Sequence, residues 1–204
     1  MILRKSVNVS VFCLVLALIG AVKADAWWWS SESVSIPYVT SADTVERIAE
    51  DIIRDVWGAE NNWQQLDESL PTARVVSIRS IPQINGTLAL DMRVRLERQV
   101  TESELIFKYL DKVQELMPKL LAEDKLKGHD EFRLFGSLPM MDIERNISES
   151  GITKLSLTRT LAQKITWDKA NGYDLHHYLM RLNAAKKCTY WIHGGILSQA
   201  KWLK

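Results

Sequence analysis

Apolar residues dominate the first part of the chain, ahead of any amphipathic pattern. Positions 7–22 are apolar apart from one asparagine, one serine and one glycine, and Arg4 and Lys5 precede them. Small residues at 22–26 provide a cleavage site of the A-x-A type, so the segment has each part of a secretory signal peptide. Because the apolar run is shorter than the roughly 20 residues that span a bilayer, we expect residues 1–26 to be removed. A retained signal anchor, with the domain outside, is the alternative.

Further along, the spacing of apolar residues predicts helices over 40–58, 102–117 and 174–187. Thr40 with Asp43 fits a capping box in front of the first helix, and Asp174 stands where the third helix needs an N-cap carboxylate. Pro118 lacks a backbone donor, so we expect it to kink or end the second helix. Each of the three helices is predicted to have one apolar face.

Elsewhere the apolar period changes to two, which is typical of strands. Residues 73–81 and 87–99 flank Asn85-Gly86, a strong turn signal, so we expect a β-hairpin over 73–99. Between positions 88 and 96 of the second run, the even-numbered residues are apolar and the odd-numbered residues are mostly polar. That alternation predicts a strand with one dry and one wet face.

A second group of extended segments follows the middle helix: 131–138, 140–147 and 152–167. We expect a turn at 148–151 and a short strand at 188–193, and a helix over 156–166 is the alternative for the last segment. Consecutive strands joined by short turns form antiparallel sheets. The order of elements therefore predicts an α+β fold, with an antiparallel sheet of about five strands and helices packed on one face.

Charge and cysteine content narrow the functional classes. Loss of residues 1–26 lowers the number of Lys and Arg from 26 to 23, and that of Asp and Glu from 25 to 24. This balance argues against nucleic-acid binding, which needs a surplus of basic residues. Cys188 is then the one cysteine left, so no intramolecular disulfide is expected. We divide the chain into a signal peptide (1–26), a Trp-rich irregular lead-in (27–40) and a single α+β domain (41–204).

Tryptophan is abundant for a chain of this length and gathers near its ends. Trp27, Trp28 and Trp29 follow the predicted cleavage site directly, and Trp202 lies near the C-terminus between two lysines. Exposed indoles favour association with a partner, a glycan or a membrane surface, unless the protein's own C-terminal segment covers them. Core positions are expected for Trp57, Trp63 and Trp167.

The wet face of strand 87–99 carries Arg93 and Arg95 beside Asp91 and Glu97. Mixed charges two residues apart on a sheet normally form cross-strand pairs. They also suit an interface with an acidic partner. We therefore treat Arg93 and Arg95, together with the terminal tryptophans, as candidate interface residues.

The candidates for catalysis are weak. His176 and His177 follow Asp174, but neighbouring helical side chains point about 100° apart, and a helical zinc pair is spaced four residues apart. Cys188 and His193 form the other combination, although strand residues five apart lie on opposite faces. The sequence has no phosphate-binding loop, nucleophile elbow, CxxC pair or calcium loop. Neither a metal site nor a cofactor is expected.

These observations favour an exported, non-enzymatic accessory or interaction domain of the cell envelope, periplasmic or secreted, as part of a membrane-associated assembly. Its expected partner is an envelope protein or the membrane surface, and not a nucleic acid. The first alternative is a small exported hydrolase or metal-dependent enzyme that uses Asp174, His176 and His177. The second is a carbohydrate-binding module with exposed tryptophans as stacking platforms. The sequence leaves the oligomeric state open.

Overall fold

The computed structural model describes residues 44–99, 101–168 and 171–199. The chain divides into two compact units, Met1–Ser35 and Ile36–Lys204, and every described residue belongs to the second. The predicted signal peptide, the Trp-rich lead-in and Trp202 lie outside the described residues, so these expectations stay predictions. In the part of the chain that is described, no helix combines the length and the apolarity needed to cross a membrane.

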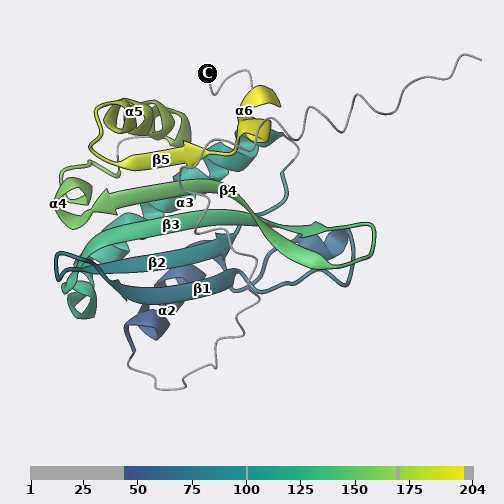
Figure 1. The fold of residues 1–204 in the computed structure, drawn as a ribbon, viewed down its shortest axis with the longest axis horizontal. Helices are drawn as coiled ribbons and strands as arrows, with labels where there is room; N and C mark the ends of the chain where they lie inside the picture. Colours follow the sequence, from purple (N-terminus) through teal and green to yellow (C-terminus); the bar gives the residue numbers. More distant parts are fainter. Residues whose placement is uncertain (1–43, 100, 169–170, 200–204) are drawn as a thin grey trace, which may run out of the picture. The chain divides into compact units, whose positions relative to one another are not determined.

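Strands β1 (Val75–Pro82), β2 (Leu88–Arg95), β3 (His129–Met141), β4 (Ile147–Thr158) and β5 (Thr189–Ile192) form one sheet. They lie side by side in chain order (Figure 1). β2 and β3 run parallel, and the other neighbouring pairs run antiparallel. The α+β class and the five strands are confirmed, but the expectation of an antiparallel sheet is wrong because the sheet is mixed.

Helix α3 (Glu102–Ala122) explains the parallel pair. It connects β2 to β3, and a strand reached through a crossover helix can enter the sheet in the same direction as its predecessor. Short turns join β1 to β2 and β3 to β4, which are antiparallel. The sequence predicted a helix between these two strands, and the error lay in applying the rule for strands joined by short turns to the whole sheet.

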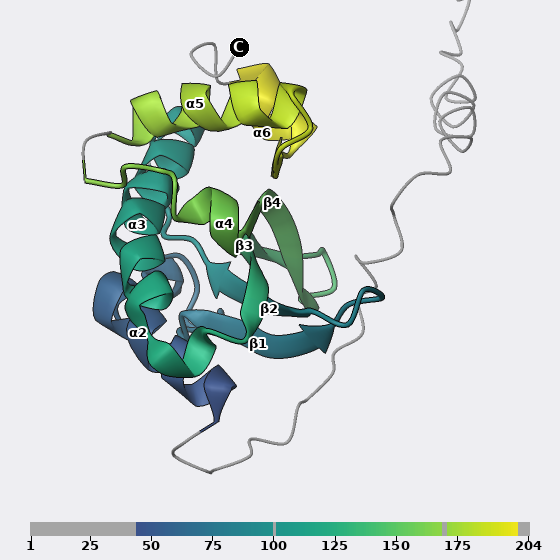
Figure 2. The same ribbon diagram turned by 90° about the vertical axis from the view of Figure 1, so that its left-hand side faces the viewer.

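The remaining helices are α2 (Val45–Trp57), α4 (Arg159–Ala162), α5 (Gly172–Ala184) and α6 (Gly194–Gln199), with short 3₁₀ turns η3 (Trp63–Gln65) and η4 (Asp124–Leu126). Figure 2 shows α2, α3 and α5 on one side of the sheet. Leu90, Met92 and Val94 of β2 are fully buried, whereas the odd-numbered residues between them are partly exposed. The prediction of a dry and a wet face for this strand is confirmed.

The core lies between the sheet and these helices, with the apolar stripe of α3 at its centre. Trp57 and Trp167 are buried in it, as expected. Trp63 differs, because it is only half-buried. Its indole N–H donates to the carbonyl oxygen of Leu96 at 2.6 Å, so Trp63 fastens the loop after α2 to the end of β2.

Two predicted helix starts are corrected by the caps. α2 begins after Thr44, whose hydroxyl accepts the backbone N–H of Arg47 at 3.2 Å. α5 begins after Asn171, and the Asn171 side chain accepts the N–H of Asp174 at 2.9 Å. Asp174 is therefore a residue of the first helical turn and not the N-cap.

Pro118 does not end the middle helix, since α3 continues to Ala122. Leu120 beyond it is fully buried, and Lys119 pairs with Asp55 of α2. These tertiary contacts outweigh the hydrogen bond that a proline removes from a helix interior.

The first hairpin is confirmed, whereas the second β section differs from the prediction. Gly86 has a φ of +81° in the β1–β2 turn, which glycine adopts without strain. β3 and β4 are joined by a turn at 142–146, and the predicted turn at 148–151 is part of β4. Asp142 accepts the N–H groups of Glu144 and Asn146, each at 2.8 Å, so a turn forms without glycine or proline. The predicted third segment, 152–167, ends as a strand at Thr158 and continues as α4.

Candidate binding surface

The side of the sheet opposite α2, α3 and α5 is not covered by any described helix (Figure 2). Strand register places Asp91 of β2 beside Arg79 of β1 and Arg133 of β3. Phe135 of β3 lies between two further cations, Arg93 of β2 and Lys154 of β4. We call this surface the helix-free face and define it by Arg79, Asp91, Arg93, Arg95, Glu131, Arg133, Phe135, Glu149, Lys154, Ser156 and Trp191.

Arg133 organises the acidic side chains at the centre of this face. Its guanidinium donates to Glu131 at 2.6 Å and lies 3.7 Å from Asp91. Ser156 donates its hydroxyl to Glu131. Burial alone would raise the pKa of Glu131, but the hydrogen bonds from Arg133 and Ser156 outweigh it and lower that pKa. Glu131 is therefore a fixed negative charge at neutral pH.

The negative charge of Asp91 is less well compensated than that of Glu131. Its Oδ1 atom is buried without a hydrogen-bond partner among the described residues. Burial raises the pKa of Asp91 in spite of the nearby Arg133 charge, and Glu131 raises it further. The face therefore holds one carboxylate whose negative charge the surroundings disfavour.

Arg95 is engaged in hydrogen bonds with other residues of the domain. Its Nε donates to Glu149 of β4 at 2.5 Å, and its Nη1 donates to the carbonyl oxygen of Ala73 at 2.7 Å. Ser137 donates to the other oxygen of Glu149 at 2.9 Å. The cross-strand pairing expected for Arg95 is confirmed, and its role in an interface stays a prediction.

Arg93 belongs to a cluster of cations around an aromatic ring. Its guanidinium lies 5.8 Å from the centroid of Phe135, and the Lys154 ammonium lies 5.5 Å from the same centroid, both within the range of cation–π attraction. Trp191 is paired with Lys154 across the β4–β5 ladder and is 38% exposed. Sequence reasoning missed Lys154 and Phe135, because only the register of three strands brings them beside Arg93.

Charges on the helix-free face do not balance among the described residues. Five side chains are cationic (Arg79, Arg93, Arg95, Arg133 and Lys154) and three are acidic (Asp91, Glu131 and Glu149). Burial, and next the charge of Arg79, lower the pKa of Arg93. Positive charge is therefore crowded near β1 and β2, and an anionic group on this face would relieve the repulsion.

Each edge strand of the sheet has a backbone donor that is already engaged. At the β1 edge, Glu46 of α2 accepts the backbone N–H of Ser80 at 3.2 Å, and Pro82 has no N–H to offer. At the β5 edge, Asn183 of α5 accepts the N–H of Tyr190 at 3.1 Å. Occupied or missing edge donors disfavour strand addition, so a partner is more readily accommodated on a face than on an edge.

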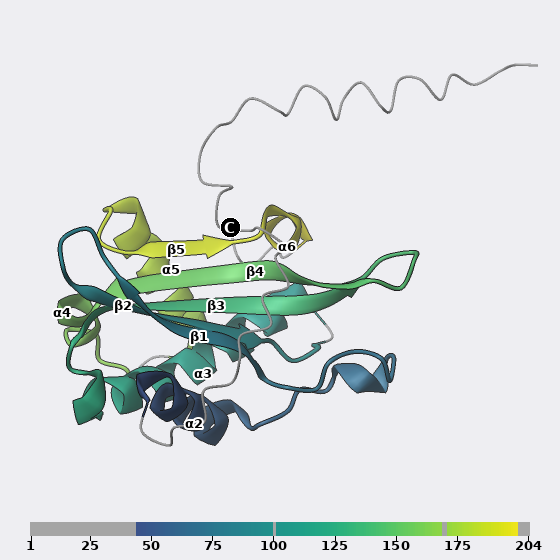
Figure 3. The same cartoon turned by 60° about the horizontal axis from the view of Figure 1, so that its bottom comes forward.

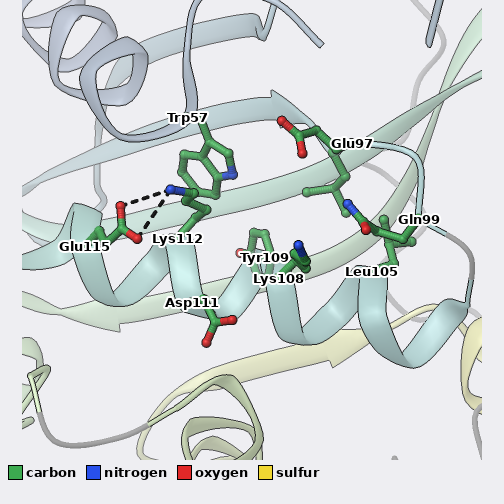
Figure 4. A pocket seen from close by; sticks show the side chains of 10 residues that line it. Trp57, Glu97, Gln99, Leu105, Lys108, Tyr109, Asp111, Lys112 and Glu115 are labelled. Atoms are coloured by element: carbon green, nitrogen blue, oxygen red, sulfur yellow. Dashed lines mark hydrogen bonds and ion pairs between the residues drawn. The ribbon is translucent and has the colours of Figure 1, made fainter. Parts of the chain in front are cut away.

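A groove of about 250 Å³ lies on the other side of the molecule, between the end of α2, the end of β2 and α3 (Figure 4). Trp57 and Tyr109 form its floor, with ring centroids 6.2 Å apart. Two of the charges at the rim are engaged with each other, since Lys112 binds Glu115 at 3.0 Å. A third, Asp111, accepts the N–H of Gly172 at 2.7 Å. The groove therefore resembles a packing seam more than a binding site.

The neighbouring histidines of α5 do not form an acid–base pair. His176 is buried, and its Nδ1 shares a hydrogen bond with the hydroxyl of Tyr190 at 2.9 Å. His177 is half-buried against Tyr173, with ring centroids 4.4 Å apart. The two imidazoles touch, with centroids 5.2 Å apart, but Asp174 is exposed in the first turn. His176 is therefore a buried residue of the helix interior face and not an exposed acid–base group.

Cys188 and His193 are also separate. Burial raises the pKa of Cys188 to about 11, which makes its thiol a poor nucleophile at neutral pH. His193 is exposed beyond the end of β5, where its Nδ1 accepts the N–H of Gly195 at 3.1 Å. Within the described ranges, no three His, Cys, Asp or Glu side chains come together in a way that would hold a metal ion.

A serine–histidine contact that the sequence did not reveal links β1 and β3. The Oγ of Ser80 lies 2.7 Å from the Nε2 of His129. No carboxylate among the described residues accepts a hydrogen bond from the buried His129 Nδ1, and its neighbour there is the backbone of Leu126, so the arrangement lacks the acidic third member of a catalytic triad. Burial lowers the pKa of His129, and the pair is best explained as a buried structural contact.

Comparison with protein families, with curated proteins and with solved structures found no match to this chain. The interpretation of the helix-free face therefore depends on its own geometry and charge.

Proposed function

We propose that this protein is an exported, non-enzymatic accessory or interaction domain of the cell envelope, periplasmic or secreted, and that it binds an acidic protein partner through the helix-free face. Export is supported by the N-terminal sequence, in which a basic start, an apolar run and small residues follow one another. An accessory role is supported by the burial of His176, whose imidazole is engaged by the Tyr190 hydroxyl, and by the high pKa of Cys188.

The observation that carries the binding proposal is the charge distribution of the helix-free face. A mixed sheet with helices on one side leaves the other side for contacts, and here that side has a surplus of two positive charges among its described residues. Arg79 is exposed at its rim. An acidic partner would gain attraction from several cations at once, and complementary potentials of this kind mainly increase association rate and specificity.

Binding can be tested with a fluorescent polyglutamate peptide as the acidic probe. We expect the double variant Arg79→Glu, Lys154→Glu to bind it roughly tenfold more weakly than the unmodified chain, because two attractive contacts become repulsive. Lys108→Glu with Lys164→Glu is the matched control, since Lys108 on α3 and Lys164 after α4 are exposed and lie outside this face. Equal loss in the control would show that only net charge matters and would refute the assignment of the face.

Export needs a separate measurement. The full chain is expressed in a host with a secretory pathway, and the N-terminal residue of the recovered protein is determined. We expect cleavage within or directly after the small residues at 22–26. An intact Met1 on material from the cell interior would contradict the exported location.

A further inference from the structure

The end of the β3–β4 hairpin projects beyond the rest of the sheet. The β2–β3 register stops at Arg95 and Ser137, and the β4–β5 register stops at Thr153 and Ile192. Residues 138–150 therefore pair only with each other or form the turn between them. Figures 1 and 3 show this pair of strands extending past its neighbours. We call residues 138–150 the arm.

The arm exposes apolar side chains to solvent. Ile143 at the turn is 102% exposed, Met140 is 51% exposed and Ile147 is 40% exposed. Single exposed apolar residues are common on protein surfaces, but a group of them on one projecting element marks a site of interaction. An isolated two-stranded hairpin is also only marginally stable in water, so such an element gains from being covered.

Hydrogen bonds hold the tip of the arm in one conformation. Besides accepting two backbone N–H groups, Asp142 accepts the side-chain amide of Asn146 at 2.9 Å. These bonds, first of all that from the Asn146 side chain, lower the pKa of Asp142. Arg145 completes the turn with a φ of +64°. Because the turn is already ordered, covering Ile143 would cost little conformational entropy.

The surroundings of the arm are acidic. Figures 1 and 3 show η3 at the same end of the molecule as the arm. Hydrogen bonds from Ser69 are the main cause that lowers the pKa of Asp67 in the loop after η3, and the charge of Arg145 contributes as well. That loop adds Leu66, which is 51% exposed. The charged residues of the tip and the loop are four acids and one base: Asp67, Glu68, Asp142, Glu144 and Arg145.

We propose that the arm, together with Leu66, is a docking site for a cationic amphipathic segment of a protein partner. Such a segment offers apolar side chains to cover Ile143 and Met140, and basic side chains to meet Asp67 and Glu144. This charge complementarity selects it over an anionic membrane or the arm of a second copy, both of which the acidic residues would repel. The site differs in sign from the helix-free face and shares only Glu149 with it, so the domain has two surfaces that can bridge an acidic and a basic partner.

A dye-labelled amphipathic helical peptide of lysine and leucine is the probe, with the full chain as receptor. We expect Ile143→Asn to weaken binding roughly tenfold, as loss of one buried aliphatic contact does. Ile84→Asn is the matched control, because Ile84 is equally exposed, at 109%, in the turn of the other hairpin. Glu144→Gln with Glu68→Gln should weaken binding and reduce its dependence on salt.

Three results would overturn the proposal. The first is an equal loss for Ile143→Asn and Ile84→Asn, which would mean nonspecific adhesion. The second is equal binding of an amphipathic peptide of glutamate and leucine, which would remove the charge argument. The third is binding to vesicles of phosphatidylcholine that depends on Ile143 and is stronger than binding to the cationic peptide. That result would make the occupant a membrane. Arg79→Glu with Lys154→Glu should leave binding of the cationic peptide undiminished, so failure of the helix-free face and failure of the arm are distinguishable.

Discussion

Gly172 occupies the point where α5 comes closest to α3, and replacing it with alanine should separate the two helices. A Cβ at this position would lie 2.4 Å from the carbonyl oxygen of Phe107 and 2.9 Å from Oδ1 of Asp111. The first of these atoms belongs to the backbone of α3, which cannot give way as the end of a flexible side chain can. The hydrogen bond from the Gly172 N–H to Asp111, 2.7 Å long, depends on the same close approach.

The free energy of unfolding should fall by about 2–5 kcal/mol. Overpacking costs roughly 1–3 kcal/mol, and the lost hydrogen bond to a charged group adds roughly 1.5–3 kcal/mol. Alanine regains about 1 kcal/mol, because it is the better helix former. For a domain of this size each kcal/mol lowers the melting temperature by about 2–4 °C, so a loss near the middle of the range, about 3 kcal/mol, gives a shift of roughly 6–12 °C.

Urea denaturation followed by tryptophan fluorescence measures the effect, and Gly128→Ala is the matched control. A Cβ at Gly128 meets nothing within 4 Å, so this substitution should be neutral or should stabilise by about 0.4–1 kcal/mol. If Gly172→Ala and Gly128→Ala unfold at the same urea concentration, the inference that α3 and α5 approach closely at Gly172 is wrong.

Three further predictions concern buried polar groups. Arg74 is completely buried and donates to the carbonyls of Arg95 at 2.7 Å and Glu60 at 2.6 Å. Arg74→Met should therefore lower the free energy of unfolding, measured by chemical denaturation, by about 2–4 kcal/mol. An unchanged denaturation midpoint would refute the stabilising role of these hydrogen bonds. Burial lowers the pKa of His129, so the unfolded chain binds the proton more readily and stability should fall as the pH drops through about 6.5. His129→Gln should flatten that part of a stability–pH profile, and an identical profile would contradict the assignment. With its pKa raised to about 11, Cys188 should react with iodoacetamide at pH 8 far more slowly in the folded than in the unfolded chain, as mass spectrometry can show.

Much of the local structure followed from the sequence. The helical stripe over 102–117 and the alternation over 87–99 each identified an element and the face that it buries, because burial of one face imposes the period of the element on the chain. Asn85-Gly86 identified the first hairpin for a similar local reason, since few residues adopt a left-handed φ without strain. The turn at 142–146 was not predicted, because the hydrogen bonds of Asp142 replace the glycine or proline that marks most turns.

The candidate surfaces were less predictable. Arg93 and Arg95 are two residues apart and look equivalent in the sequence, yet Arg95 is committed to Glu149 and Arg93 lies over Phe135. Arg74 gave no signal of burial at all. Ile143 was assigned to a strand, whereas the structure places it at the exposed tip of the arm.

The sequence by itself determined the α+β class and the faces that α3 and β2 bury, whereas the export signal stays a prediction. Tertiary structure alone decided that β2 and β3 run parallel, that His176 is enclosed beside Tyr190, and which charges share the helix-free face. Periodicity and turn propensity are properties of residues that are close together in the chain, so the sequence alone reveals them. Register, crossover direction and charge clustering depend on residues that are distant in the chain, and folding alone brings these together.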